Sequence, residues 1–328
     1  MKEISIKSIP NIKIGNAQNE KAGTGCTVIL CGNGARAGLD VRGGGPASRE
    51  SELLKPMAAA QSIHAVLLSG GSAFGLDAAG GVQRYLEERG IGFDVGITKV
   101  PLVCQSCLFD LTVGDMMTRP DQSMGYEACR NAESGNYRDG NVGAGTGATV
   151  GKLKGMEYCM KSGIGSFAVQ IGKLQVGALA AVNALGDIYD WKTGEKAAGL
   201  LDENKTDFLS SEEEAFKSYE AIHNKFVGNT TIGAVVTNAK FDKSQLCKIA
   251  GMAQDGYARS IRPVHTSADG DSIYALSAGE IEADQDMVGA LAARVMSEAI
   301  LNAVKNAESA YGFPCRKEIL EKQIISRR

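Results

Sequence analysis

Histidine is scarce in this sequence, which has only His64, His223 and His265 among its 328 residues. A Ser-His-Asp triad or a zinc site built on imidazole groups is hard to assemble from so few. His64 opens an apolar segment and is expected in the core, His223 falls in a polar linker, and His265 lies in a loop after a proline. The shortage favours a nucleophile that uses its own amine as the base.

An excess of positive charge and long apolar runs are missing as well. The sequence has 35 Lys and Arg against 38 Asp and Glu, so its net charge is −3 and we expect no nucleic-acid partner. No apolar run approaches the ~18 residues of a membrane span, and residues 1–15 lack the apolar segment of a signal peptide. We therefore expect a cytoplasmic protein without a membrane partner.

Cysteine is present but not in a pattern that indicates a metal site. Eight cysteines in a long chain without an export signal are expected to be free thiols rather than a disulfide framework. Cys104 and Cys107 form a lone C-x-x-C, and neither a second such pair nor a pair of histidines offers further zinc ligands. We predict no metal and no cofactor, and we assign these two cysteines no role.

The periodicity of apolar residues predicts a mixture of strands and helices. An apolar content of 44% supports a sizeable core. Strands are expected at 27–30, 63–68, 92–95, 166–170, 174–183, from 230 and at 272–276, and helices from Ser48, after Gly75, over 121–133, after Asp242 and near 286–307. A turn at Gly172 joins two of the strands into a hairpin. The sequence thus predicts one α/β domain with antiparallel sheets rather than a doubly wound nucleotide-binding fold.

An unusual junction lies at Asn229-Thr230. Residues 202–228 are polar and charged, and an apolar, β-branched run begins at Ile232. A Thr hydroxyl at such a place can attack the preceding carbonyl group, so that an ester forms and water cleaves it. The new N-terminal Thr would carry a nucleophile and a base, because its α-amino group has an unperturbed pKa near ~8. The alternative is an ordinary strand start, since Thr favours strands.

Three other motifs have plainer structural explanations. The run Gly70-Gly71-Ser72-Ala73-Phe74 is close to a nucleophile elbow but has Phe in place of the last Gly, so a tight turn with Ser72 as a helix cap is expected. The loop at 143–147 fails the phosphate-loop pattern and predicts a close backbone approach, and Lys152 beyond it is, on its own, typical of a surface lysine. Asp269-Gly270-Asp271 is either a simple turn or a carboxylate pair that orders hydroxyl and ammonium groups.

Taken together, the sequence resembles the L-aminopeptidase/D-esterase family, which includes β-peptidyl aminopeptidases and nylon-oligomer hydrolases. The matching stretches occur in order along the whole chain, at 40–54, 64–93, 141–155, 176–187, 228–239 and 258–279. Two of them, SGGSAFGLDAA from Ser69 and NVGAGTGAT from Asn141, carry the resemblance most specifically.

The resemblance implies a fold and a processing event. The fold would be a four-layer αββα sandwich, similar in architecture to the N-terminal-nucleophile hydrolases but of different topology. The precursor would cleave itself between Asn229 and Thr230 into an α chain, 1–229, and a β chain, 230–328. A homo-oligomer of αβ units that acts on a small peptide or amide substrate is also implied.

The resemblance further implies a set of site residues around Thr230, the nucleophile. Asn183 matches the amide of the family's oxyanion hole. Lys152 matches a lysine of the nylon-hydrolase branch, and Asp269 and Asp271 match the Asp pair of that branch.

These matches predict a self-processing amide or peptide hydrolase. Thr230 attacks the amide carbonyl, its amine or a water accepts the proton, and Asn183 stabilises the oxyanion together with a backbone N–H of a glycine loop. Lys152 favours the deprotonated nucleophile, while the Asp pair holds the amine and Lys152. Two alternatives stay open. One is an acyltransferase that resembles the ornithine acetyltransferases, and the other is an uncleaved, non-enzymatic protein that binds a small molecule.

Overall fold

The computed structural model describes residues 1–217 and 228–326. Its strands are β1 (Lys2–Ile4), β2 (Lys13–Asn19), β3 (Thr24–Val41), β4 (Ala47–Arg49), β5 (Ile63–Ser69), β6 (Phe93–Asp94), β7 (Lys99–Val100), β8 (Val103–Cys107), β9 (Thr149–Val150), β10 (Met160–Lys161), β11 (Ile164–Ile171), β12 (Leu174–Asn183), β13 (Asp187–Tyr189), β14 (Lys196–Ala198), β15 (Thr230–Ala239), β16 (Ile261–Arg262) and β17 (Ser272–Ile281). Its α-helices are α1 (Ala78–Glu87), α2 (Gln122–Glu133), α3 (Ser211–Lys217), α4 (Lys243–Ser260), α5 (Gln285–Lys305) and α6 (Arg316–Ser326).

Two sheets form the centre of the molecule, and they share one long strand. The first sheet has the order β1-β11-β12-β15-β17-β3, and the second contains β2, β3, β5, β8 and β4. The 18-residue strand β3 pairs with β17 through residues 36–41 and with β2 and β5 through its earlier residues. A strand of this length can belong to both sheets, because it continues from one into the other.

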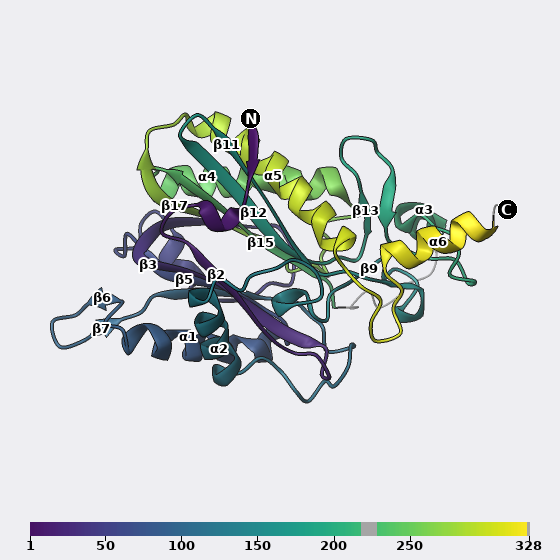
Figure 1. Cartoon of the computed structure of the whole chain (residues 1–328), viewed down its shortest axis with the longest axis horizontal. Helices are drawn as coiled ribbons and strands as arrows, with labels where there is room; N and C mark the ends of the chain where they lie inside the picture. The colour runs from purple at the N-terminus through teal and green to yellow at the C-terminus, as the bar shows by residue number, and fades with distance from the viewer. Residues whose placement is uncertain (218–227, 327–328) are drawn as a thin grey trace.

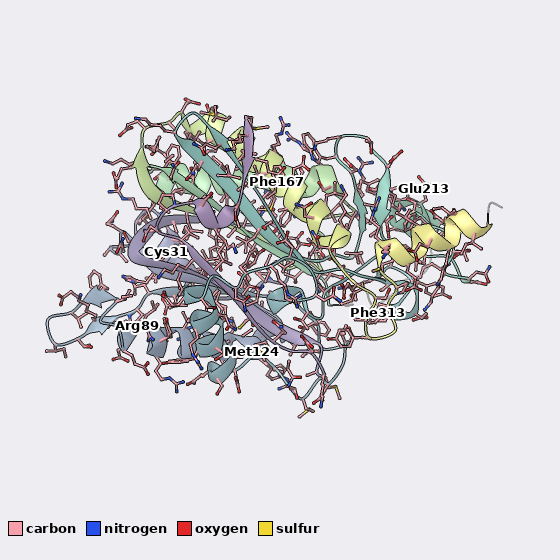
Figure 2. All side chains as sticks on the ribbon, viewed as in Figure 1. Cys31, Arg89, Met124, Phe167, Glu213 and Phe313 are labelled. Carbon is pink, nitrogen blue, oxygen red and sulfur yellow. The ribbon has the colours of Figure 1, made fainter. Side chains whose placement is uncertain are left out.

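Helices cover the outer face of each sheet (Figure 1). In this view α4 and α5 lie along the first sheet and α1 and α2 lie along the second. Three apolar cores separate the four layers, and labelled residues mark them in Figure 2: Phe167 packs against the core under α4 and α5, Cys31 lies in the core between the sheets, and Met124 packs against the core under α1 and α2. The chain therefore folds as the four-layer αββα sandwich that the resemblance implies.

Alternation along the strands accounts for this layering. In β12, Val176, Ala178, Ala180 and Val182 face the helices of the first sheet, whereas Leu179 and Ala181 face the core between the sheets. Successive side chains of a strand point to opposite faces, so a strand that is apolar throughout must be covered on both sides. All ten residues of β12 except Gln175 are buried, as expected for a central strand.

Several elements confirm the sequence predictions closely. The hairpin predicted around Gly172 is the antiparallel pair of β11 and β12, and Gly172 has φ of +57° in its turn. Asp242 caps α4 in a capping box with Gln245, in which each side chain accepts from the other residue's backbone N–H. All eight cysteines are free thiols, as predicted.

Other predictions are wrong in detail. No helix begins at Ser48, because residues 47–49 form β4 and pair with β8 before a short 3-10 helix at Ser51–Leu54. The strand expected at 92–95 is reduced to the two exposed residues of β6. The sheets are not purely antiparallel, since β5 pairs with β8 and β15 pairs with β17 in parallel.

Helix α5 differs from the expectation that no segment reaches the length of a membrane span. By length and composition it is apolar enough to cross one, and it is the one such helix in the described part of the chain. Its most apolar window is 72% buried inside the protein. This burial against the first sheet is what a core helix shows.

Candidate active site

Thr230 is the first residue of β15 and lies beside Asn183, the last residue of β12. The antiparallel register places these two residues directly opposite each other. The Thr230 hydroxyl donates a hydrogen bond to the carbonyl oxygen of Asn229 and accepts one from the backbone N–H of Gly270 at 3.1 Å. In the uncleaved chain the predicted nucleophile is therefore in contact with the carbonyl group that it is predicted to attack.

Lys152 is buried next to this pair, with 1% of its surface exposed. Its ammonium group donates to Asn183 Oδ1 at 2.6 Å, to the backbone carbonyl of Asn183 at 3.1 Å and to that of Gly228 at 3.1 Å. The preceding Gly151 has φ of +77°, and a Cβ there would meet the backbone of residues 199–200 at 2.1 Å. The expectation of a surface lysine is wrong, because this glycine turn directs Lys152 into the interior.

The Asn183 side chain has a fixed orientation. Its Oδ1 accepts from Lys152 and from the backbone N–H of Thr149 at 3.1 Å, and its Nδ2 donates to the carbonyl oxygen of Phe109 at 2.8 Å. Lysine ammonium and backbone N–H groups can only donate, so the oxygen of the amide must face them. Its N–H groups then face the other way, as an oxyanion donor requires.

The two aspartates occupy the loop before β17 and have different partners. Asp271 accepts the backbone N–H of Thr231 at 2.8 Å through one carboxylate oxygen and the His265 imidazole at 2.9 Å through the other. Asp269 accepts the N–H and the hydroxyl of Thr266, both at 2.7 Å, and so stabilises its own turn. Asp271 is thus hydrogen-bonded to β15, the strand that begins with Thr230. Within the described residues, neither carboxylate hydrogen-bonds Lys152.

Burial shifts the titration of these groups towards neutral pH. Desolvation lowers the pKa of Lys152 to about 8, although Cys159, Asp269 and Asp110 oppose the shift. Desolvation and the charge of Asp271 raise the pKa of Asp269 to about 6. A lysine and a carboxylate that titrate near neutral pH in one buried site are typical of catalytic centres.

Comparison with known proteins identifies the family. The sequence profile of peptidase family S58 matches residues 5–317. The chain belongs to this family. An uncharacterized aminopeptidase of Mycobacterium leprae is 38% identical, over 94% of this chain and 92% of its own length. A 6-aminohexanoate-oligomer endohydrolase of an Agromyces species is 30% identical, over 90% of this chain and 84% of its own length.

Solved structures with a similar fold support the architecture. The L-aminopeptidase D-Ala-esterase/amidase of Ochrobactrum anthropi, described as a variant of the N-terminal-nucleophile hydrolase fold, superposes with a TM-score of 0.70 at 17% identity, covering 99% of this chain and 94% of its own. A β-aminopeptidase of a Burkholderia species superposes with a TM-score of 0.67 at 18% identity, covering 98% and 93%. Membership of the S58 family, with its aminopeptidases and amidases, assigns the chain to the hydrolases of C–N bonds.

Three groups in this S58 site had not been singled out by the sequence. They are the carbonyl of Phe109, the N–H of Gly270 and the imidazole of His265. The first two are backbone groups, for which the side-chain sequence carries no signal. His265 could have been found from the sequence, because it lies only six residues before Asp271. In the structure its φ is +58°, and its Nε2 has no hydrogen-bond partner among the described residues.

The sequence predicted Ser72 as a helix cap, and this prediction is wrong. The cap position is Gly71, and Ser72 is the first residue of the 3-10 helix at Ser72–Asp77, with φ of +53°. Its backbone N–H donates to the carbonyl of Leu108 at 2.9 Å, while the N–H of Gly71 donates to Asp110 at 2.7 Å. The turn is tight because neighbouring loops hold its backbone.

The cysteine pair and the histidines that were considered as metal ligands from the sequence have the following positions. Cys104 and Cys107 are buried on β8, where desolvation raises the pKa of the Cys104 thiol to about 12. The described residues contain no group of three His, Cys, Asp or Glu side chains placed to hold a metal ion. His64 is in the core, as expected, and accepts the N–H of Leu102 through Nδ1. His223 lies outside the described residues.

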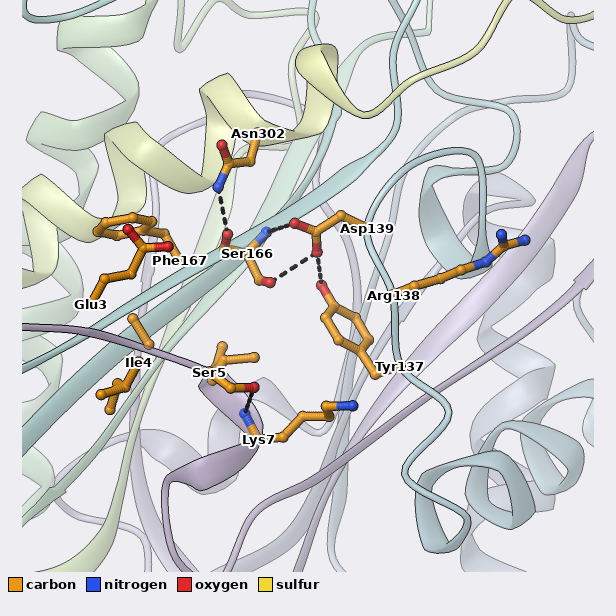
Figure 3. Close-up of a pocket in the computed structure, with 12 residues that line it drawn as sticks. Glu3, Ile4, Ser5, Lys7, Tyr137, Arg138, Asp139, Ser166, Phe167 and Asn302 are labelled. Atoms are coloured by element: carbon orange, nitrogen blue, oxygen red, sulfur yellow. Dashed lines mark hydrogen bonds between the residues drawn. The ribbon is translucent and has the colours of Figure 1, made fainter.

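A hollow of about 320 Å³ lies elsewhere, beside β1 and β11 (Figure 3). Asp139 there accepts hydrogen bonds from the N–H and the hydroxyl of Ser166 and from the Tyr137 hydroxyl. None of the predicted catalytic residues lines it. By contrast the predicted site is closed in the uncleaved chain, since Thr230 is 4% exposed and Asn183 is fully buried.

Proposed function

We propose that this S58 protein is a self-processing hydrolase of peptide or amide bonds with Thr230 as its N-terminal nucleophile. The contact between the Thr230 hydroxyl and the Asn229 carbonyl carries the proposal. An acyl shift from nitrogen to oxygen needs these two groups side by side, in a place that holds the hydroxyl still. The N–H of Gly270 on the same hydroxyl oxygen supports that requirement.

Self-cleavage proceeds in two steps. The Thr230 oxygen bonds to the Asn229 carbonyl carbon, the C–N bond breaks, and the hydroxyl proton ends on the Thr230 nitrogen, which becomes the free amine. Water then hydrolyses the ester between Asn229 and Thr230, which yields the Asn229 carboxylate and restores the hydroxyl. The products are the α chain, 1–229, and the β chain, 230–328.

Substrate hydrolysis repeats this chemistry on an external amide. Thr230 Oγ attacks the substrate carbonyl, its amine accepts the proton and passes it to the leaving amine, and water discharges the acyl-Thr230 ester. Asn183 Nδ2 stabilises the oxyanion after exchanging its hydrogen bond to Phe109 for one to the substrate. Lys152 supplies positive charge beside the nucleophile, and Asp271 holds the start of β15.

The substrate class is a small peptide or amide. The names of relatives support this range, because they include aminopeptidases and an endohydrolase of 6-aminohexanoate oligomers. We also propose that the protein works in the cytoplasm as a homo-oligomer of αβ units, without a nucleic-acid or membrane partner.

The intact mass of the purified protein tests the proposal. Division of 34.4 kDa in proportion to length gives pieces of about 24 and about 10 kDa for cleavage before Thr230. N-terminal sequencing of the small piece should begin Thr-Thr-Ile-Gly. An active enzyme that stays as one chain, or a small piece with another N-terminus, would contradict the nucleophile assignment.

A further inference from the structure

A second buried lysine lies behind the predicted oxyanion donor. Lys161, the last residue of β10, is fully buried. Its ammonium group donates to three backbone carbonyl oxygens, those of Gly145 at 3.2 Å, Ala148 at 2.9 Å and Ser162 at 2.5 Å. Among the described residues it forms no ion pair. Burial removes water from an ammonium group at a cost in free energy, so a buried lysine without an ion pair needs a reason.

The carbonyl groups belong to the segment that leads into the site. Gly145 and Ala148 lie in the glycine-rich loop, and the next residue, Thr149, donates its N–H to Asn183 Oδ1. The N–H of Ser162, the residue after β10, also donates to the carbonyl of Ala148, at 3.0 Å. Two neighbouring residues, Lys161 and Ser162, therefore both hydrogen-bond to the loop. The position of the Thr149 N–H therefore depends on where Lys161 holds the loop.

The orientation of the Asn183 amide depends on that N–H in turn. Lys152 and Thr149 together require the amide oxygen on their side. If the loop moved and the Thr149 donor were lost, Lys152 would be the one remaining donor described on the amide oxygen. The amide would then be freer to rotate and present its oxygen to the reacting carbonyl. An oxygen in that place would repel the developing negative charge instead of stabilising it.

We propose that Lys161 is a positioning residue that acts through the loop 145–148 and the Thr149 N–H to keep the Asn183 amide in its donating orientation. This inference rests on the proposed function, in which Asn183 is the oxyanion donor. Lysine suits the place because its ammonium group offers three donors at one point, which no apolar side chain can replace. The carbonyl oxygens of the loop would otherwise be buried without partners.

Lys161→Met tests the proposal, with Lys243→Met as the matched control. Lys243 is also a buried lysine on two backbone carbonyls, those of Ala58 and Ala60, both at 3.0 Å, but it begins α4, beyond the far end of β15. Both variants should lower Tm. In fully cleaved Lys161→Met, kcat and kcat/KM should fall together by about 10- to 100-fold with KM nearly unchanged. Lys243→Met should keep the wild-type kcat.

A double variant separates positioning from general damage. Lys161→Met combined with Asn183→Ala should be no slower than Asn183→Ala alone, because Lys161 acts only through that amide. A Lys161→Met enzyme as fast as the control, or a double variant slowed by the product of the two factors, would overturn the proposal. Lys161→Gln, which keeps an amide donor, replaces the Met variant if the latter is insoluble or uncleaved.

The single variant Asn183→Ala keeps the two proposals apart. If its cleaved form turns over at the wild-type kcat, the oxyanion role of Asn183 fails and the present inference fails with it. If it is slow while Lys161→Met is fast, only the inference about Lys161 fails. All variants are assayed on a 6-aminohexanoyl or β-alanyl amide, on material whose cleavage is confirmed by mass.

Discussion

Each sheet contains one pair of parallel strands with a helix between them in the chain, which together form a strand-helix-strand unit. Each unit has a hydroxyl residue whose backbone or side chain is held by neighbouring groups. In the second sheet, Ser72 follows β5 at the turn into α1, and β8 completes the unit. In the first sheet, Thr230 begins β15, α4 follows, and β17 completes the unit. Ser72 has the more unusual backbone, with φ of +53°, and stands in the motif that is closer to a known nucleophile.

The surroundings of the two hydroxyl groups differ much more than their backbones. Ser72 is half-buried at a turn held by backbone contacts. Thr230 is buried between the Asn229 carbonyl and the Gly270 N–H, next to a side-chain amide that is hydrogen-bonded to a buried lysine. A sharp turn presents a hydroxyl, whereas activation needs donors, a base and a neighbouring electrophile. The comparison therefore favours Thr230.

Removal of the Thr230 hydroxyl should have the largest effect. Thr230→Ala should remain a single chain of 34.4 kDa and show no hydrolysis, because the attacking oxygen is gone. Thr230→Ser is the control and should still cleave. A denaturing gel and the intact mass decide the outcome, and cleavage of the Ala variant before residue 230 would remove the distinction between the two hydroxyl groups.

Loss of the side-chain amide beside Thr230 should come next. Cleaved, folded Asn183→Ala should lose ~10²–10³ in kcat and in kcat/KM, with little change in KM, because the donor acts only on the developing oxyanion. Steady-state kinetics on the chosen amide measure the loss. If only stability fell, by about 1–3 kcal/mol, Asn183 would be structural.

A methyl group at Gly270 should disturb the other side of the nucleophile. A Cβ there would lie 2.8 Å from Thr230 Oγ1 and 2.9 Å from the carbonyl oxygen of Gly45. Gly270→Ala should therefore slow self-cleavage by about 10-fold or more, measured as the half-time of the intact chain after synthesis. Gly45→Ala, whose Cβ would meet only ordinary contacts at 3.7 and 3.9 Å, is the control and should cleave at the wild-type rate.

The buried side chain of Lys161 should make the free energy of unfolding depend on pH. Desolvation lowers the pKa of Lys161 from 10.5 to about 7, so between these values the unfolded state binds one more proton than the folded state. The contribution of Lys161 to the free energy of unfolding is therefore fully present above pH 10.5 and is lost as the pH falls towards 7. From pH 7 to 9 the unfolding free energy of the wild type should rise by about 1–3 kcal/mol relative to Lys161→Met. Urea denaturation at both pH values measures this difference. If the unfolding free energies of the two proteins changed in parallel, the pKa of Lys161 would not be lowered in the folded state.

Removal of the Ser72 hydroxyl should have the smallest effect. Ser72→Ala should keep self-cleavage and most hydrolysis, because its backbone rather than its side chain is held by the neighbouring loop. The kcat of the purified variant is the measurement. A loss of more than ~10³-fold with folding intact would make Ser72 the better nucleophile and reverse the comparison.

The local part of this fold could be predicted from the sequence. Apolar runs, the hairpin at Gly172 and the capping box at Asp242 depend on neighbours in the chain, and the structure confirms them. The helix expected at Ser48 was wrong because pairing with β8, almost 60 residues away, overrides the local preference. Long-range pairing of this kind leaves no periodic signal.

The residues themselves indicated the Asn229-Thr230 junction and offered Asp269 and Asp271 as a carboxylate pair, but the rest of the site was accessible only through the family resemblance. Asn183 lies opposite Thr230 because of the register between β12 and β15, which involves residues 47 positions apart. Lys152 looked like a surface residue until the turn at Gly151 placed it in the interior. Backbone donors and acceptors such as Gly270 and Phe109 depend on loop positions, which side-chain identities alone do not determine.

The order of strands in the first sheet has a consequence for what cleavage would produce. Strands β15 and β17 both follow Thr230 in the chain, yet they are inserted between β12 and β3, which both precede it. A cut before Thr230 would leave the two pieces threaded into one another, with hydrogen-bonded ladders on both sides of the inserted pair. Neither fragment would retain the complete first sheet by itself. The two pieces would therefore have to be made as one polypeptide, fold once, and remain a permanent non-covalent pair.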